Sequence, residues 1–153
     1  MKTKHQVSAG GIVYKKDGKK ILWLITQHSQ HKGWVFPKGL VGDHEKKEPM
    51  EQAALREVEE EGGVKAKIVT DKPIRTNYQY MWPSFVKTSA GKRETLIKKT
   101  VYYFLMEYVS GDPKNHDWEM MDAKFVTEDV VKKTLTYSSD KEAFEKILKA
   151  PKF

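Results

Sequence analysis

The stretch REVEEEGG, residues 56–63, places four glutamates within five positions of a chain whose formal net charge is +7. Like charges three or four positions apart repel each other on a helix, and acidic side chains near a helix C-terminus oppose the helix dipole. The two glycines that close the stretch predict the end of that helix. Because both electrostatic effects are unfavourable, the stretch predicts that something else holds these carboxylates together.

The helix that carries this stretch is expected to run from Pro49 to Glu61, with proline at its first position. Glu57, Glu60 and Glu61 are then three and four positions apart, so their side chains share one face. Three converging oxygen ligands suit Mg2+ or Mn2+, and such an ion would turn their repulsion into attraction. For the glutamates alone, a solvated acidic helix end is the more common explanation.

The surrounding residues change that balance, because they follow a fixed spacing. The pattern runs Gly42, five residues, Glu48, seven residues, Arg56-Glu57-Val58, one residue, Glu60-Glu61, one residue, Gly63-Val64. This resembles the Nudix box at every specified position. WVFPKG, residues 34–39, is similar to the stretch that usually ends in the box glycine of this family, which favours Gly39 and a three-residue insertion. By spacing alone, Gly42 fills the position.

The resemblance extends over most of the chain and points to the diadenosine-polyphosphate hydrolase subgroup. SAGGIVY (8–14), KTVYYFLMEY (99–108) and WEMMDAKFV (118–126) look like elements of that subgroup. The resemblance implies an α+β fold, a Nudix-type α/β/α sandwich around a mixed β-sheet, with residues 1–153 as a single domain. The segment from Asn77 to Lys98 stands apart, since it is long for a simple hairpin.

Composition places broad limits on the class of protein. The 153 residues include 39% hydrophobic and 32% charged residues and no cysteine, which suits one globular domain in a reducing compartment. The N-terminus lacks the apolar core of a secretory signal, and no apolar run is long enough to span a bilayer. We therefore expect a cytoplasmic protein without a membrane partner. The positive charge favours anionic partners such as nucleotides, polyphosphates or RNA, although solvated surface lysines would explain it equally.

The remaining elements follow from periodicity and turn signals. Asp17-Gly18 predicts a hairpin turn, a second turn is expected near residues 88–92, and Ser139 with Glu142 has capping-box spacing. Strands are expected at 5–16, 21–28, 34–39 (broken by Pro37), 64–69, 73–82, 95–109 and 122–126, and C-terminal helices at 127–135 and 138–150.

The resemblance also assigns catalytic roles. It implies that Glu57, Glu60, Glu61 and Glu119 are ligands of Mg2+ or Mn2+, and that one carboxylate acts as the general base. Glu119 is equally well explained as an ordinary loop glutamate. Glu48 is expected to be a secondary ligand. Arg56 is expected to orient a box glutamate through an ion pair.

Substrate contacts are implied for Lys38 and Gly39 beside the box, and for Lys99 before the aromatic strand. Tyr103 is expected to line the pocket and Tyr137 to stack on a base. Surface lysine and core aromatic are the alternatives. Four histidines form no zinc pattern and are interpreted as loop residues: His28, His31, His44 and His116.

Taken together, the resemblance implies a metal-dependent pyrophosphohydrolase that splits a dinucleoside polyphosphate such as diadenosine tetraphosphate into ATP and AMP. The alternative enzyme removes pyrophosphate from an RNA 5′ end, which the basic charge and the aromatic segment near residue 80 favour. Other nucleoside triphosphates and inositol pyrophosphates stay open as substrates. A non-catalytic nucleotide sensor is the alternative of another class, and the complete set of box glutamates argues against it.

Overall fold

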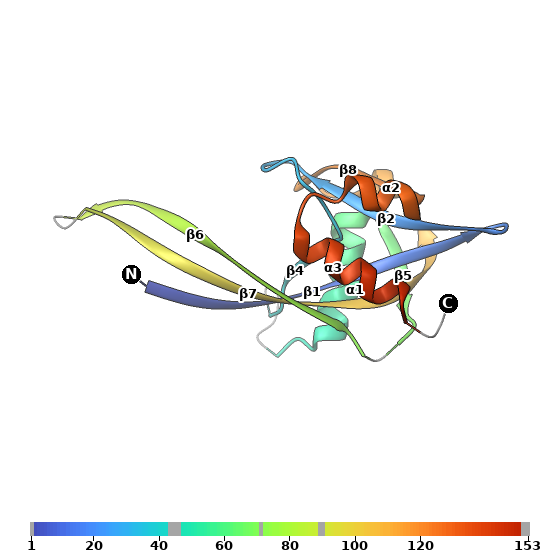
Figure 1. Ribbon diagram of the computed structural model, residues 1–153, viewed down its shortest axis with the longest axis horizontal. Helices are drawn as coiled ribbons and strands as arrows, with labels where there is room; N and C mark the ends of the chain where they lie inside the picture. The colour runs from blue at the N-terminus through green and yellow to red at the C-terminus, as the bar shows by residue number, and fades with distance from the viewer. Residues whose placement is uncertain (1, 43–46, 71, 89–90, 151–153) are drawn as a thin grey trace.

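The computed structural model describes residues 2–42, 47–70, 72–88 and 91–150. Within these residues the chain forms one mixed β-sheet, three α-helices and a short 3₁₀ helix at Pro113–Asn115 (Figure 1). The strands are β1 (Lys2–Asp17), β2 (Lys20–His28), β3 (Trp34–Val35), β4 (Lys38–Leu40), β5 (Val64–Ile68), β6 (Ile74–Thr88), β7 (Gly91–Gly111) and β8 (Met120–Thr127). The helices are α1 (Met50–Gly62), α2 (Glu128–Thr134) and α3 (Ser138–Leu148). The α+β fold class is confirmed.

The sheet is built around β1 and β7, which pair in parallel over most of β1. Its central path runs β3-β2-β1-β7-β5, while β4 pairs with β1, β6 with β7 and β8 with β2. The predicted Asp17-Gly18 turn joins β1 to β2, and Gly18 has a φ of 63°, which glycine adopts without a steric penalty. The β1–β2 hairpin therefore forms at a local turn signal that the sequence already shows.

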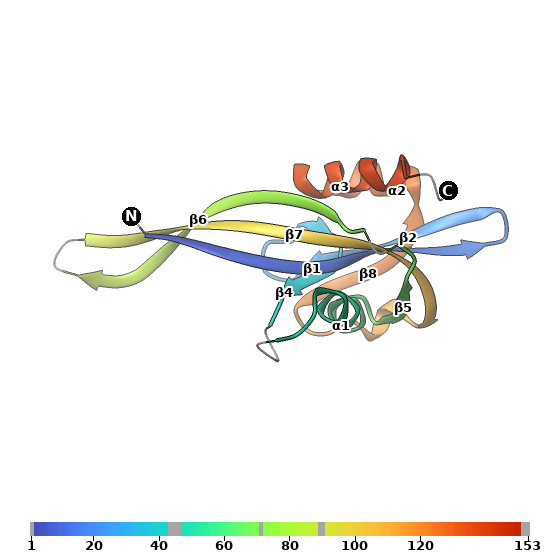
Figure 2. The same ribbon diagram turned by 90° about the horizontal axis from the view of Figure 1, so that it is seen from below.

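Helices cover both faces of the sheet, as Figure 2 shows with α1 on one side and α2 and α3 on the other. Ile12 and Val13 are neighbours in β1, both fully buried, yet they belong to different hydrophobic clusters. Such a strand is covered on both faces, because successive side chains point to opposite sides. Val13 belongs to the same cluster as Val58 of α1, and Ile12 to the same cluster as Phe144 of α3. The expected α/β/α sandwich is confirmed.

The segment that looked too long for a hairpin does form one. β6 and β7 pair from Ile74 with Tyr103 out to Thr88 with Gly91, with a register shift between Pro83 and Lys87. Figure 1 shows this hairpin, together with the start of β1, extending well beyond the helices. The middle of the turn predicted at 88–92, at residues 89–90, lies outside the described residues, as do His44 and Glu45.

Local predictions failed at two helix starts. Ser139 is not a cap: α3 begins at Ser138 after Tyr137, without a capping side-chain hydrogen bond. α1 begins at Met50, one residue later than expected, so Pro49 precedes the helix and is not its first residue. WVFPKG divides into β3 and β4, as expected from its proline, and the Pro37 carbonyl accepts a hydrogen bond from Gly11 N–H. Among the described residues, no helix has the length and apolar character that crossing a membrane requires.

Candidate active site

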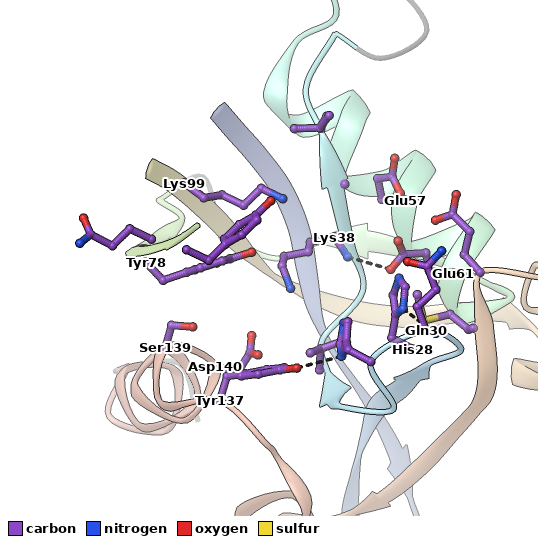
Figure 3. A pocket seen from close by; sticks show the side chains of 18 of the residues that line it. His28, Gln30, Lys38, Glu57, Glu61, Tyr78, Lys99, Tyr137, Ser139 and Asp140 are labelled. Carbon is purple, nitrogen blue, oxygen red and sulfur yellow. Dashed lines mark hydrogen bonds between the residues drawn. The ribbon is translucent and has the colours of Figure 1, made fainter. Parts of the chain in front are cut away.

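A cavity of about 1040 Å³ opens between α1, the start of α3, and strands β4, β6 and β7 (Figure 3). Eight of the ten residues predicted for the site line it: Lys38, Gly39, Glu57, Glu60, Glu61, Lys99, Glu119 and Tyr137. Arg56 and Tyr103 do not line it. Residues far apart in the sequence therefore meet in one place, with acidic side chains on one side and cationic and aromatic side chains on the other.

The acidic side, here called the carboxylate wall, consists of Glu57, Glu60, Glu61 and Glu119. Helix α1 positions the first three because its adjacent face, with Ala54 and Val58, is buried in the core. The helix ends at Gly63, whose φ of 73° is left-handed and whose N–H bonds the Glu59 carbonyl. The next carbonyl, of Glu60, accepts a hydrogen bond from Asp117 N–H at 2.8 Å. This bond ties the end of α1 to the loop that carries Glu119.

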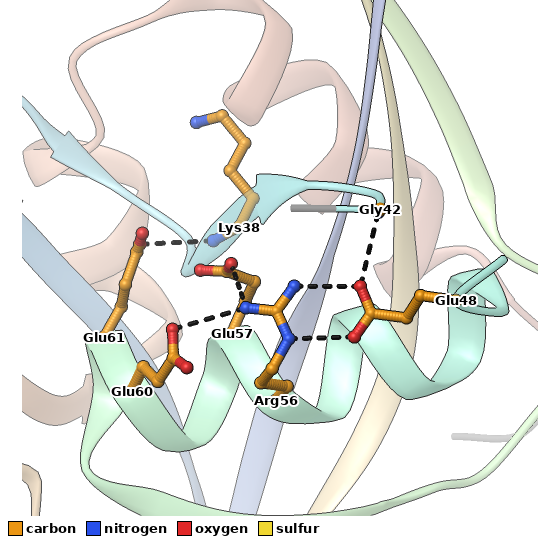
Figure 4. A network of polar contacts seen from close by, with 7 residues as sticks. All are labelled: Lys38, Gly42, Glu48, Arg56, Glu57, Glu60 and Glu61. Carbon is orange, nitrogen blue, oxygen red and sulfur yellow. Dashed lines mark hydrogen bonds and ion pairs between the residues drawn. The ribbon is translucent and has the colours of Figure 1, made fainter. Parts of the chain in front are cut away.

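Arg56 is the positively charged partner of the glutamate stretch (Figure 4). Its Nε and Nη2 each lie 2.9 Å from a carboxylate oxygen of Glu48, and its Nη1 lies 2.7 Å from Glu57 and 3.4 Å from Glu60. The predicted orienting ion pair is therefore present. Glu48, expected as a secondary metal ligand, is instead buried and forms a bidentate ion pair with this guanidinium. It also accepts a hydrogen bond from Gly42 N–H at 3.3 Å.

The two candidate box glycines have separate positions. Gly42, which matches the spacing, has a φ of 83° and supplies the N–H to Glu48. Gly39 lies on β4, and a Cβ built there would overlap the Glu57 carboxylate. The placement of the box glycine at Gly39, with an insertion in the loop, stays a prediction. Gly39 matters for another reason, since a Cβ there would displace the Glu57 carboxylate from its present position.

Burial makes the charged forms of two wall carboxyls unfavourable. Desolvation raises the pKa of Glu57 to about 7 and that of Glu61 to about 8, although Arg56 and Lys38 respectively act against it. The charge of Glu119 raises both pKa values further, which places its carboxylate within electrostatic reach of the two. Glu61 also accepts a hydrogen bond from Lys38 N–H at 3.3 Å.

This donor set fits a divalent cation. Hard oxygen ligands are what Mg2+ and Mn2+ prefer, and a cation would stabilise the ionised forms that burial disfavours. Within the described part of the chain, no three acidic, histidine or cysteine side chains are gathered closely enough to form a metal site as they stand. Arg56 instead draws Glu57 and Glu60 to itself, so ion binding requires these side chains to adjust.

The opposite side, here called the cationic wall, consists of Lys38, Lys99, Tyr78 and Asp140. Lys38 and Lys99 point into the cavity from β4 and β7 (Figure 3). Desolvation and the charge of Lys38 lower the pKa of Lys99. Tyr78 is paired directly with Lys99 across the hairpin. Two cationic groups so close to each other suit an anionic ligand such as a phosphate chain.

Tyr103 lies behind Asp140 of this wall, outside the cavity lining. Asp140 is only 2% exposed and accepts a hydrogen bond from the Tyr103 hydroxyl at 2.6 Å. Tyr103 itself is 1% exposed and packs in the core, so the prediction that it lines the pocket is wrong. Burial raises the pKa of Asp140, against the lowering effect of Lys38. Sequence reasoning missed Asp140, because nothing in SSDKEAF separates an aspartate at a helix start from a cavity residue.

An unexpected cluster of rings lies at the edge of the cavity. The rings of His28 and His31 stack at 4.3 Å between centroids, and the Tyr137 hydroxyl lies 2.8 Å from His31 Nδ1. Gly33 makes room, since a Cβ there would meet the Tyr137 ring at 2.7 Å. Both histidines were interpreted as ordinary loop residues. Desolvation and Lys38 lower the pKa of each, which favours neutral rings at neutral pH.

Known proteins resemble this chain in sequence and in fold. A family model described as the NUDIX domain matches residues 4–147. The putative mutator protein MutT4 of Mycobacterium tuberculosis is 28% identical over 151 residues, covering 95% of this chain and 55% of that protein. Nudix hydrolase 6 of Arabidopsis thaliana is 30% identical over 127 residues, covering 80% of this chain and 39% of that protein. The chain thus spans about half the length of these curated relatives, or less.

Among solved structures, the Ap4A hydrolase of C. elegans matches with a TM-score of 0.63. The identity is 22%, and the match covers 95% of this chain and 97% of that one. At this identity the likeness concerns the fold. It places the sheet, α1 and the C-terminal helices in a known arrangement, around which the cavity described above is built.

Proposed function

The chain belongs to the Nudix family, and we propose that it is a metal-dependent pyrophosphohydrolase that cleaves dinucleoside polyphosphates. The observation that carries this proposal is the opposition of two walls across one cavity, with four carboxylates, two of them buried, on one side and two lysines on the other. A polyphosphate chain complexed with a divalent cation complements both sides at once. The aromatic rings at the cavity edge supply surfaces for the nucleosides.

The proposed metal ligands are Glu57, Glu60, Glu61 and Glu119. When bound, Mg2+ or Mn2+ neutralises phosphate charge and lowers the pKa of water. Arg56 keeps Glu57 and Glu60 oriented through the ion pairs described above. Gly39 leaves the space that Glu57 occupies. A carboxylate of this wall accepts the proton of the attacking water, a role that suits a group whose pKa lies near neutral pH.

Lys38 and Lys99 are proposed to bind the phosphate chain opposite the carboxylates. Water adds to one phosphorus atom of diadenosine tetraphosphate, and the bond from that phosphorus to its bridging oxygen breaks. The products of asymmetric cleavage are ATP and AMP. Tyr137 is proposed to stack on one adenine at the rim, since 40% of its surface is exposed there.

A parallel substrate panel tests this proposal. Purified protein with Mg2+ or Mn2+ is assayed on diadenosine tetraphosphate, nucleoside triphosphates, 5′-triphosphorylated RNA and an inositol pyrophosphate. We expect the highest kcat/KM on diadenosine tetraphosphate, with ATP and AMP in equal amounts. ADP as the sole product would contradict asymmetric cleavage. Binding of nucleotides without turnover of any of them would instead favour the sensor.

A further inference from the structure

Three aromatic side chains on β6 form a ladder that leads out of the cavity. Tyr78, Tyr80 and Trp82 alternate along the strand and therefore share one face. Their rings are 6.2 Å and 6.5 Å apart between successive centroids. Tyr78 is partly buried at the cavity, whereas Tyr80 is 37% and Trp82 59% exposed. The ladder thus starts inside the proposed active site and becomes more accessible along the hairpin.

The neighbouring strands add positive charge to the same face. Tyr78 pairs with Lys99 of β7 and Tyr80 with Ile97, which in turn pairs with Lys4 of β1. Directly paired residues in a sheet point to the same side, so Lys99 and Lys4 lie on the side of the ladder. The described residues of this surface, here called the hairpin face, are Gln6, Lys4, Lys2, Lys99, Ile97, Thr95, Tyr78, Tyr80 and Trp82. None of these described residues is acidic.

The combination of exposed rings and lysines matches one class of ligand. Proteins bind single-stranded nucleic acid without base pairing by stacking bases on aromatic side chains and by neutralising phosphates with Lys or Arg. The ring spacing is close to two nucleotide steps of about 3.4 Å each. A duplex would not fit this scheme, because its base faces are already stacked on one another.

We propose that the hairpin face binds single-stranded nucleic acid, with the polyphosphate-bearing end in the cavity and the following nucleotides along Tyr80 and Trp82. The direction of the strand rests on the proposed function, because Lys38 and Lys99 mark the phosphate end. The binding itself does not rest on it. Figure 1 shows that no helix covers the outer part of the hairpin, so the strand has free access.

The first test measures binding without catalysis. A fluorescently labelled single-stranded RNA of about ten nucleotides, which matches the size of known sites, carries a 5′ hydroxyl and is titrated in EDTA by anisotropy. Tyr80→Ala and Trp82→Ala are each expected to weaken binding by about fivefold or more. Met81→Ala is the matched control, because Met81 lies between them, is 41% exposed and points to the other face. Its affinity should equal that of the wild type.

The second test measures the charge contribution. For single strands, each phosphate contact contributes about 0.7 to the slope of log K against log salt concentration. Lys4→Gln is expected to reduce that slope by about this amount. Lys65→Gln, an exposed change on β5 at another edge of the sheet, should leave it unchanged.

The outcomes separate this inference from the proposed function. Undetectable RNA binding, or equal losses in the Met81 and Trp82 variants, overturns the hairpin face as a nucleic-acid site whatever the enzyme hydrolyses. Equal affinity for a duplex of the same length also overturns it. A dimer that Trp82→Ala converts to a monomer would assign the face to a second copy and overturn the inference as well. Normal RNA binding by a protein that hydrolyses no polyphosphate would refute the proposed function alone.

Discussion

The two walls of the cavity are built in opposite ways. Three members of the carboxylate wall, Glu57, Glu60 and Glu61, come from little more than one turn of α1. The cationic wall takes Lys38 from β4, Lys99 from β7 and Asp140 from the start of α3. The groups proposed for chemistry are therefore fixed by local helix geometry, whereas the groups proposed for binding meet only when the whole sheet and α3 are in place.

The walls are alike in that each contains charged groups that are costly to bury, so each lowers the stability of the folded protein. Burial raises the pKa of Glu57 and Glu61, and burial beside Lys38 lowers that of Lys99. In each case the charged form is less favourable than in water, so neither wall is explained as a stabilising feature. A ligand that carries both a cation and phosphates relieves both at once. Sites that lower stability in this way are typical of function rather than of the core.

The largest expected effect concerns the carboxylate wall. Glu61→Gln, which keeps size and burial but removes charge, is expected to lower kcat on the best substrate of the panel by about 10²–10⁴-fold. EDTA should abolish turnover in the wild type. The reason is that a metal ligand or base acts mainly in the transition state. Steady-state kinetics measure the change, and circular dichroism checks that the fold is intact.

The matched control lies two positions away on the same helix. Glu59 is exposed and points away from the cavity, so Glu59→Gln should keep the wild-type rate. If Glu61→Gln also kept that rate, the carboxylate wall would have no part in catalysis.

The second expected effect concerns the ion pair that supports this wall. Arg56→Met leaves the Glu48 carboxylate, whose side chain is only 2% exposed, without its two bonds. Breaking one partner of a buried pair costs about 3–5 kcal/mol, so we expect the free energy of unfolding to fall by about 3 kcal/mol. Denaturant unfolding measures it. Lys132→Met breaks an exposed pair with Glu128 and should leave stability unchanged. An equal loss in the two variants would show that the Arg56 network contributes no more to stability than an exposed ion pair.

The sequence predicted those features that depend on residues close together in the chain, and missed those that depend on contacts between distant segments. α1, its end at Gly63 and the Asp17-Gly18 turn were predictable, because each rests on residues a few positions apart. The three members of the carboxylate wall on α1 followed from spacing on one helix. Tyr78 and Asp140 were missed, since their place beside Lys99 and Lys38 depends on pairing between β6 and β7 and on the position of α3.

Two errors show where local patterns fail. Alternation separates Tyr102 from Tyr103 in β7, but it does not say which face meets a cavity, and Tyr103 lies behind Asp140. Ser139 has capping-box spacing, yet α3 starts before it. The Tyr137 ring is held by His31 and packs over Gly33. These contacts fix Tyr137 as the residue before the helix, so α3 begins at Ser138, one residue before Ser139. In both cases a contact between distant segments overrode the local pattern.

The third expected effect is a pH dependence of stability in the metal-free protein. The pKa of Glu57 is about 7 and that of Glu61 about 8 when folded, against 4.5 for both in the unfolded chain. Between about pH 4.5 and 8 the folded state therefore binds more protons, so stability falls as pH rises through this window. We expect a loss on the order of 2 kcal/mol, because the open cavity screens both groups.

Thermal unfolding in EDTA from pH 5 to pH 8.5 measures this loss. Mg2+ should flatten the slope at high pH by binding the ionised carboxylates, and the double variant Glu57→Gln/Glu61→Gln should flatten it without metal. A metal-free wild type whose stability rises with pH over this range would reverse the assigned sign.

The smallest expected effect concerns Tyr137, which belongs to the binding side. Stacking of a base on an aromatic ring contributes roughly 1–3 kcal/mol, so Tyr137→Ala should raise KM for diadenosine tetraphosphate by about tenfold. The change in kcat should be smaller, since stacking holds the base equally in ground and transition states. The Tyr137 hydroxyl makes a separate contact, because it lies 2.8 Å from His31 Nδ1. Tyr137→Phe keeps the ring but releases His31, so a normal KM in this variant would assign the binding to the ring face. A lowered melting temperature with unchanged KM in the alanine variant would remove Tyr137 from the site and leave it as a support for the start of α3.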